Sequence, residues 1–485
     1  MTDVSIPRDP AYRDGAGLDA LNARLRRDLE WLELPPRRWT PPRRHDGAEV
    51  LDVAVIGAGM AGLAVAGALK LTGVDVRLFD RAPAGVEGPW LTYARMQTLR
   101  SPKSLTGPAL GLPALTFRAW YEAQFGLEGW RALDKIPRVQ WMDYLRWFRA
   151  ALDLPVTNGV ELTGLAGEGD LVTLGLNGPD GGFDARARRV VLATGRDGLG
   201  GPFSPDILQG LTPSLWAHSA DAIDFEALRG RRVGVIGAGA SAMDNAACAL
   251  EAGAAGLDLF VRRDRMPTIN KGKGGSGPGA FLGQAALPDD WKWRMHHYVN
   301  RQQTPPPRDS TLRVSRHANA RFHFGSPIEA VADNGREITL TTSKGEYRLD
   351  FLIAATGFRA DLGRRPELSA IAPHIRLWGD RYRPEPGQED GELSASPDLA
   401  ADFSFQEKTP GACPWLSRIH SFNYPAMLSL GKLSGDIPGV SHGAWRLAEA
   451  LAVHLYVEDR DIHFAALQAY DEPELLGDEW TDADG

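Results

Sequence analysis

The distribution of apolar residues predicts two copies of one strand–turn–helix–strand unit. In the first copy, the apolar run LDVAVIG at 51–57 leads into a glycine turn, a helical stretch that ends at Gly73, and a second apolar run at 74–80. The second copy begins with RRVGVIGAG at 231–239 and continues through a helix near 240–253 to the strand LDLFVRR at 257–263. Short apolar runs bounded by glycine are typical of buried parallel strands. We therefore predict an α/β fold with two Rossmann-like dinucleotide-binding domains.

Two further apolar strands indicate how these units are connected. They end in Ala-Thr-Gly at 193–195 and at 355–357, and they bracket the second unit, as expected when one domain is inserted between two halves of another. We predict a helical extension at 1–49, the first domain at 50–200 and 346–485, and the inserted domain at 201–345. Within the extension, leucines recur at helical spacing and prolines then end the helix: Leu18, Leu21, Leu25 and Leu29, followed by Pro35, Pro36, Pro41 and Pro42.

The first glycine motif has the features of a dinucleotide site. Its three glycines serve a tight turn, close approach to a pyrophosphate and helix packing, and the helix N-terminus donates to phosphate. An acid at the end of the next strand accepts hydrogen bonds from a ribose diol. The predicted contacts are Gly57, Gly59, Met60, Ala61, Gly62, Asp80 and Arg81.

The second glycine motif carries the opposite charge at the equivalent strand end. Its residues are Gly237, Gly239, Ala240, Ser241 and Ala242, with alanine as an accepted third position, and its next strand ends in Arg262 and Arg263. Guanidinium groups suit a ribose 2′-phosphate, which favours NADPH; the alternative is a solvated basic strand end. Opposite charges at the two riboses predict two different dinucleotides, FAD at the first motif and NADPH at the second.

Composition excludes several other classes of protein. The chain has 485 residues, 43% of them hydrophobic, and a net charge of -8, whereas nucleic-acid-binding proteins usually carry a basic excess. Its two cysteines form no C-x-x-C pair, and no cluster with metal-ligand spacing stands out. No apolar run is long enough for a membrane span, and the first residues do not resemble a signal peptide, so we expect a cytoplasmic protein.

For the tryptophans at 120, 130, 141 and 147 we expect core packing; the alternative is an aromatic wall around a ligand.

The order GxGxxG, ATG, GxGxxA, ATGF, with an acid and then arginines at the strand ends, resembles the class B flavin-dependent monooxygenases. These include the flavin-containing and the N-hydroxylating monooxygenases. The segment His218-Ser219-Ala220-Asp221 and the pair Gly435-Asp436 before a helix resemble further family segments. The chain departs from the family fingerprint before His218, where Thr212 and Ser214 replace Phe and Gly, and Ala222 replaces the Trp of the Baeyer–Villiger type. The resemblance implies cofactor contacts at Thr194, Gly195, His218, Thr356, Gly357 and Asp436.

The resemblance also implies an activity. NADPH would reduce the flavin, and oxygen would form a peroxide at flavin carbon 4a that hydroxylates nitrogen or sulfur of a small molecule. The candidate residues near the reaction are Arg100, Lys103 and Asn423, and His296 and His297 lie on a helix that either packs or closes over substrate. The chain could assemble as a homo-oligomer.

Several alternatives remain open from sequence. They are an FAD-dependent NADPH oxidase, a carbon-hydroxylating or Baeyer–Villiger-type relative, and a non-catalytic FAD-binding protein. A flavin disulfide reductase is set aside, because it would need a redox cysteine pair after the first unit and residues 81–140 contain no Cys.

Overall fold

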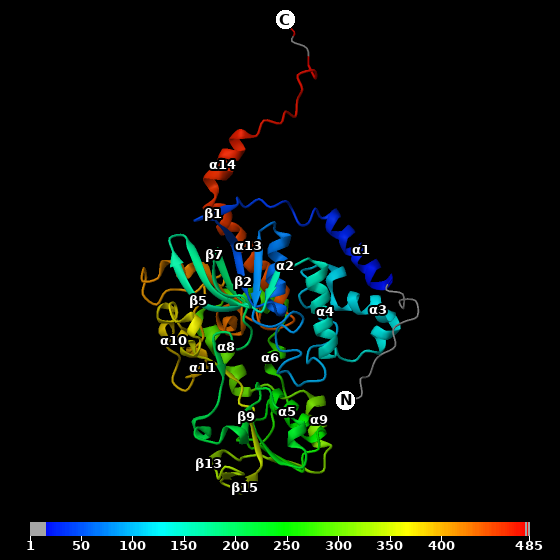
Figure 1. Cartoon of the computed structure of the whole chain (residues 1–485), viewed down its shortest axis with the longest axis vertical. Helices are drawn as coiled ribbons and strands as arrows, with labels where there is room; N and C mark the ends of the chain where they lie inside the picture. The colour runs from blue at the N-terminus through cyan, green and yellow to red at the C-terminus, as the bar shows by residue number, and fades with distance from the viewer. Residues whose placement is uncertain (1–15, 481–482, 484–485) are drawn as a thin grey trace.

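The computed structural model describes residues 16–480 and 483 and arranges them as two α/β units (Figure 1). The first unit is built on an eight-stranded sheet of order β4-β3-β2-β7-β6-β5, in which β1 pairs with β2 and β18 pairs with β7. Strands β2, β3, β4, β7 and β18 pair in parallel, whereas β5, β6 and β7 form an antiparallel meander. The strands are β1 (Arg43–His45), β2 (Ala48–Ile56), β3 (Val76–Asp80), β4 (Val156–Asn158), β5 (Glu161–Glu168), β6 (Leu171–Gly178), β7 (Gly181–Leu192) and β18 (Ile419–Ser421).

The second unit lies between β7 and β18 in the chain, so the predicted insertion and the predicted fold class are confirmed. Its parallel sheet has the order β12-β11-β10-β16-β9, and a three-stranded antiparallel sheet β13-β14-β15 packs beside it. The strands are β9 (Trp216–His218), β10 (Arg232–Ile236), β11 (Gly256–Phe260), β12 (Ala320–His323), β13 (Ile328–Asp333), β14 (Ile338–Thr342), β15 (Gly345–Leu349) and β16 (Phe351–Ala354).

The boundary predicted between residues 345 and 346 is too early. It falls inside β15, and β16 pairs with the central strand β10, so both belong to the inserted unit. The chain leaves the first unit through β8 (Gly200–Pro202) and returns through β17 (Phe358–Ala360), and these two strands pair antiparallel. Sequence placed the boundary wrongly because an apolar strand does not reveal which sheet it will join.

Each glycine motif leads into a helix that packs on its own sheet. Helix α2 (Met60–Leu71) follows β2, and α5 (Ala240–Glu251) follows β10. The predicted end of the first helix is observed, since Gly73 takes a left-handed φ of 76° after the cap at Thr72. Helix α13 (Val440–Glu458), which lies near the C-terminal end of the sequence, packs against α2.

A layer of helices flanks the first unit. It contains α1 (Ala16–Trp31), α3 (Phe117–Ala132) and α4 (Arg138–Ala151) (Figure 1). Leu21 and Leu25 bury the predicted apolar face of α1, while residues 1–15 of the extension lie outside the described part of the chain. Trp120, Trp130 and Trp141 are buried in an aromatic cluster around Phe117, which confirms that they pack the core.

The remaining helices lie mostly in the inserted unit and the C-terminal region. They are α6 (Lys271–Gly274), α7 (Pro278–Gly283), α8 (Asp289–Gln302), α9 (Arg308–Ser315), α10 (Trp378–Arg381), α11 (Gly391–Ser394), α12 (Met427–Leu430) and α14 (Arg460–Ala469). Within residues 16–480 and 483, none of the helices combines the length and apolar character needed to cross a membrane.

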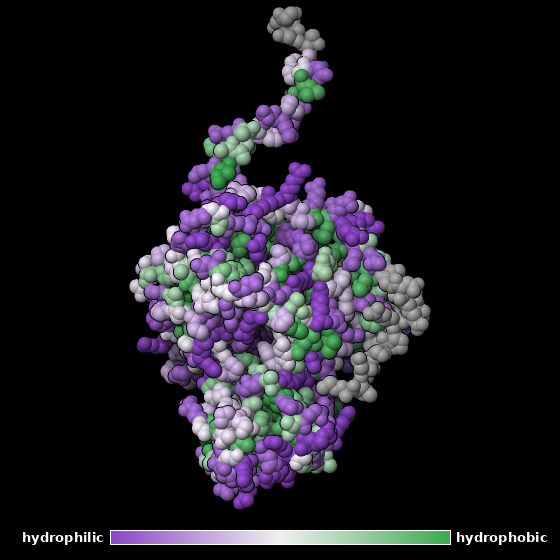
Figure 2. Space-filling view, in the orientation of Figure 1, coloured by the Kyte–Doolittle hydropathy of each residue, from purple (hydrophilic) through white to green (hydrophobic). Residues whose placement is uncertain are grey.

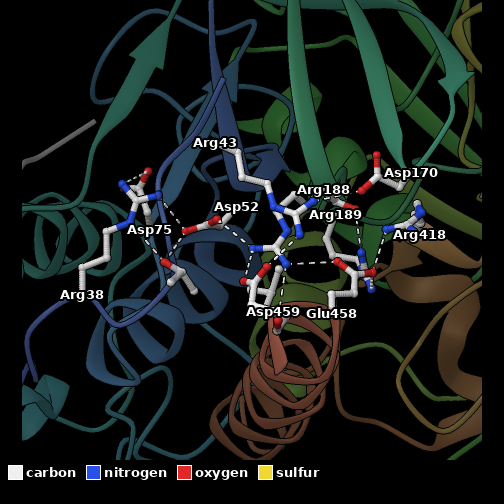
Figure 3. A network of polar contacts seen from close by, with 12 residues as sticks. Arg38, Arg43, Asp52, Asp75, Asp170, Arg188, Arg189, Arg418, Glu458 and Asp459 are labelled. Atoms are coloured by element: carbon white, nitrogen blue, oxygen red, sulfur yellow. Dashed lines mark hydrogen bonds and ion pairs between the residues drawn. The ribbon is translucent and has the colours of Figure 1, made fainter. Parts of the chain in front are cut away.

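A buried network of ion pairs holds α13 to the first sheet (Figure 3). The fully buried Arg188 on β7 contacts Asp52 on β2 at 3.4 Å and Asp459, at the end of α13, at 2.8 Å. Both carboxylates are fully buried too, and Glu458 contacts Arg188 at 3.1 Å. Charges removed from water in this way need their partners, so this network fixes the register of α13 on the sheet.

Candidate functional site

A large cavity between the two units contains both glycine motifs. Its volume is about 2510 Å³, and it is lined from both units. Because the two motifs open into one space, two dinucleotides bound there can meet. Of the predicted cofactor residues, those that line the cavity are Gly57, Gly59, Met60, Ala61, Asp80, Arg81, Thr194, Gly195, Gly237, Gly239, Ala240, Ser241, Arg262, Arg263, Thr356, Gly357 and Asp436.

The first motif has the shape that a pyrophosphate requires. Gly57 has a φ of 102°, and a Cβ there would lie 2.5 Å from the Ala193 carbonyl oxygen. A Cβ at Gly62 would lie only 1.9 Å from the Gly57 carbonyl oxygen, so this glycine packs the helix on the turn and does not line the cavity. A Cβ at Gly59 would meet nothing closer than 3.7 Å, and this is the open position where a phosphate can approach the backbone.

Asp80 ends β3 beside this turn, as the sequence predicts. Its carboxylate accepts hydrogen bonds from the backbone N–H groups of Ala58, at 2.6 Å, and Ala82, at 2.8 Å. These bonds hold the acid at the mouth of the turn, with lone pairs left for a ribose hydroxyl. The residues present therefore fit an adenine dinucleotide.

The second motif repeats this construction with a different strand end. Gly237 has a φ of 129°, and its Cβ would lie 2.5 Å from the Ala355 carbonyl oxygen, while a Cβ at Gly239 would meet no atom within 4 Å. Ala242 is fully buried and packs the helix, which explains why it does not line the cavity. Arg262 and Arg263 both line the cavity, and Arg263 donates to the Arg301 carbonyl oxygen at 3.0 Å. Arg262 is thus the freer of the two guanidinium groups for a 2′-phosphate.

Three predicted residues serve the framework of the site. His218 is buried at the end of β9, outside the cavity lining, where its Nδ1 accepts from the Ala220 N–H at 3.1 Å. Asn423 is fully buried and donates to the Thr194 hydroxyl at 3.5 Å, which ties β18 to the end of β7. Lys103 reaches the cavity wall, but its ammonium donates to the carbonyl oxygens of Trp130 and Leu133. In the structure, each of these three side chains hydrogen-bonds to other groups of the protein.

Arg100 lies where the two units meet. Its guanidinium donates to the Pro305 carbonyl oxygen of the inserted unit at 2.6 Å. Burial lowers the pKa of Arg100, and the nearby Asp436 carboxylate opposes this shift. The contact links the segment that follows the first motif to the inserted unit across the cavity.

The structure gathers a polar cluster in the cavity. It joins His296, which the sequence placed on a helix that either packs or closes over substrate, to Lys432 and Gln284, which sequence reasoning missed. Lys432 extends toward the loop of α6 and donates to the Gly272 carbonyl oxygen at 2.8 Å. His296 on α8 lies 2.5 Å from the amide nitrogen of Gln284, and burial, together with Lys432, lowers the pKa of His296 to about 4. Phe281 is buried at the same wall. An ammonium, an amide and a neutral imidazole therefore line one part of the cavity.

A further missed residue, Arg196, lies in the same cavity. It directly follows the first Ala-Thr-Gly segment, and its guanidinium lies 4.2 Å above the ring of Tyr424. Its position after a predicted cofactor segment was the one sequence signal available. For Lys432, the signal was its place just before Gly435-Asp436.

Comparisons with known proteins agree with this construction. Residues 51–367 match the model of the family described as pyridine nucleotide-disulphide oxidoreductase. A protein of Xanthomonas campestris pv. campestris, described as an FAD-dependent urate hydroxylase, is 41% identical over 466 residues, which are 95% of this chain and 98% of that protein. The chain belongs to the pyridine nucleotide-disulphide oxidoreductase family. Within that family it is an FAD-dependent monooxygenase, and the predicted class B flavin monooxygenase resemblance and the predicted cofactors, FAD and NADPH, are confirmed.

Solved structures share the fold. The ornithine hydroxylase of Pseudomonas aeruginosa in its reduced form is 16% identical, covers 84% of this chain and 100% of its own, and has a TM-score of 0.64. An ornithine N-hydroxylase of Kutzneria sp. 744, solved with reduced FAD, NADP⁺ and L-ornithine, is 17% identical, covers 84% of this chain and 99% of its own, and has a TM-score of 0.62.

The disulphide chemistry in the family name uses reactive cysteines. The chain has two cysteines, Cys248 on α5 of the inserted unit and Cys413 in the first unit, and both are free.

Proposed function

We propose that this protein is an NADPH- and oxygen-dependent hydroxylase of urate or a closely related oxopurine. The observation that carries the proposal is the 41% identity to an FAD-dependent urate hydroxylase, because it spans 95% of this chain and 98% of the relative. An alignment of that extent includes most of both units.

The polar cluster in the cavity supports this substrate class. Urate is a planar ring that carries a negative charge at neutral pH and presents N–H and C=O groups at its edges. The Lys432 ammonium suits the charge, and the Gln284 amide, which offers a donor and an acceptor, suits a lactam edge. Because His296 has a pKa of about 4, it stays neutral and can share a hydrogen bond without adding charge. The buried Phe281 ring offers an apolar face for stacking.

Residues of the two units have different roles in the reaction. Bound FAD supplies the redox chemistry and activates oxygen, and NADPH supplies the electrons. The glycine turns at 57–62 and 237–242 hold the two pyrophosphates, Asp80 orients one ribose, and Arg262 selects the other through its 2′-phosphate. Lys432 orients the substrate, and the contact of Arg100 with Pro305 helps to keep the units together around it.

Hydroxylation of nitrogen or sulfur, which the resemblance predicts, is the second candidate. The names of structural neighbours with this fold, ornithine and lysine hydroxylases, favour it. Those substrates carry ammonium groups, which a second ammonium such as Lys432 would repel. We therefore rank urate first.

The test is an oxygen-uptake assay with the purified flavoprotein. Urate, ornithine, lysine and cadaverine are each added to enzyme and NADPH, and ¹⁸O₂ is used to label the product. We expect urate to accelerate NADPH oxidation and to gain one labelled oxygen atom. Acceleration by an amine alone would instead support nitrogen hydroxylation. Oxygen uptake that no substrate accelerates would support an NADPH oxidase, and no uptake at all would support a non-catalytic FAD-binding protein.

A further inference from the structure

The C-terminal arm, residues 460–480, projects from the body as a helix and an extended segment (Figure 1). Helix α14 has ten residues, and none of them is buried. Isolated helices shorter than about 12–15 residues are marginal in water, so packing of an apolar face normally stabilises a helix of this length. The start of α14 is held by His463, whose ring stacks on Tyr456 of α13 with centroids 4.4 Å apart, but the apolar side chains further along the helix have no such surface on the body.

The arm exposes large apolar side chains interspersed with polar ones (Figure 2). On α14, Phe464 is 59% exposed and Leu467 is 69% exposed. Further exposed apolar side chains follow on the helix and the extended segment. They are Ile462, Tyr470, Leu475, Leu476 and Trp480. Large apolar side chains gathered on one exposed segment are typical of an interaction site.

An apolar groove lies at the base of the arm. It has a volume of about 300 Å³ and is lined by Trp39, Ala452, Val453, Tyr456 and Val457. The Trp39 ring lies 6.1 Å from Tyr456 and 6.0 Å from His463, so the N-terminal segment forms one wall of the groove. The extended segment beyond α14 points away from the body of the protein (Figure 1).

The charges beside the groove are opposite to those on the arm. Residues 471–480 contain five carboxylates and no basic residue: Asp471, Glu472, Glu474, Asp478 and Glu479. The segment that carries Trp39 is RRWTPPRR at 37–44. Arg37 and Arg44 are exposed and form no ion pair with a carboxylate in the described part of the chain.

We propose that the protein is a dimer in which the C-terminal arm of each copy packs into the Trp39 groove of the other. A two-fold arrangement requires that the surface be self-complementary, and an arm and a groove on the same chain meet this requirement. Apolar contacts from α14 and the extended segment supply the affinity, and the acidic segment meets Arg37 and Arg44. This assignment gives the N-terminal segment a role in assembly and does not depend on the identity of the substrate.

The first test is sedimentation velocity of the full-length flavoprotein at micromolar concentration. We expect a mass of twice 52.7 kDa for the wild type and 52.7 kDa for the double variant Phe464→Glu/Leu467→Glu. Phe183→Glu, at another exposed apolar position that is 45% exposed, should stay dimeric. Flavin absorbance and NADPH oxidation should be equal in all three proteins. A monomeric wild type, or a double variant with the mass of the wild type, would overturn the proposal.

A second test locates the contact between copies. Chains carrying Val457→Cys and chains carrying Leu475→Cys, each in a background with Cys248→Ser and Cys413→Ser, are mixed and oxidised. We expect a disulfide-linked dimer in the mixture that neither chain forms alone. A mixture without this dimer, from a protein that sediments as a dimer, would place the interface elsewhere and overturn the proposal.

Discussion

The equivalent glycines Gly57 and Gly237 allow the two cofactor sites to be separated by single substitutions. Both have positive φ values, and a Cβ at either would lie 2.5 Å from a carbonyl oxygen of the neighbouring strand end. We predict that purified Gly57→Ala lacks most of the flavin absorbance seen at about 450 nm in the wild type. Gly237→Ala should keep the flavin and raise the KM for NADPH by about tenfold or more, since one hydrogen-bonded contact is worth about 1.4 kcal/mol or more when lost.

The two variants serve as controls for each other, because the local strain is alike and only the bound dinucleotide differs. Equal loss of flavin in both would contradict the assignment of FAD to the first motif and NADPH to the second.

Lys432 provides the residue-scale test of substrate recognition. Lys432 lines the cavity together with Gln284 and His296, and its ammonium, which donates to the Gly272 carbonyl oxygen, keeps further donors for a substrate. A charge-assisted contact is worth about 1.5–3 kcal/mol. We predict that Lys432→Met raises the dissociation constant for urate by about 10- to 100-fold, measured by the change in the flavin spectrum on titration. Lys70→Met, at a surface lysine paired with the exposed Asp153, should leave the constant unchanged. Equal urate affinity in wild type and Lys432→Met would remove Lys432 from the binding site.

At the scale of elements, the buried charges decide how α13 is held on the first sheet. Removing Arg188 would leave Asp52 and Asp459, both fully buried, without their shared cation. We predict that Arg188→Leu lowers the free energy of unfolding by about 3–5 kcal/mol, because uncompensated buried charge is costly. Arg232→Leu breaks two partly exposed ion pairs, with Asp350 and Glu337, and should cost about 1 kcal/mol or less for each. Urea unfolding followed by tryptophan fluorescence measures the free energy of unfolding of both variants. An equal decrease in the two would contradict the larger cost predicted for the buried network.

At the scale of the whole molecule, stability should fall in weak acid. His420 on β18 is fully buried, its Nδ1 contacts the Asp402 carbonyl oxygen at 2.8 Å, and burial lowers its pKa from 6.5 to about 4. The unfolded chain therefore binds a proton between pH 6.5 and about 4 that the folded chain does not bind. The contribution of neutral His420 to the free energy of unfolding is fully present above pH 6.5 and is lost as the pH falls through this window.

We predict that His420 alone accounts for about 2 kcal/mol of the loss between pH 7.5 and pH 5, since one pKa unit corresponds to about 1.4 kcal/mol. Urea unfolding of wild type and His420→Gln at both pH values measures this difference. Parallel pH profiles for the two proteins would contradict it. Other groups, such as His296, keep some pH dependence in the variant, so the prediction concerns the difference and not the whole slope.

The amino-acid sequence by itself determined the parts of this protein whose causes are local. A glycine with positive φ, an apolar strand and a following helix lie within a few residues of one another, so both dinucleotide motifs, Asp80 and Arg262 could be placed from their spacing. The repeated motif and the two Ala-Thr-Gly strand ends also indicated the inserted unit. The packing role of Trp120 and Trp141 followed from the usual behaviour of tryptophan.

Only the tertiary structure decided what depends on residues that are distant in sequence. Gln284, His296 and Lys432 come from three separate segments, and no local pattern marks a side chain that meets its partners across a cavity. Asn423 and Lys103 have the residue types expected near a flavin, yet backbone and hydroxyl groups from other segments bind their polar atoms. The edge of the inserted unit was misplaced for the same reason. Strand pairing and side-chain contacts are set by the whole fold, because burial and hydrogen bonding depend on which segments meet.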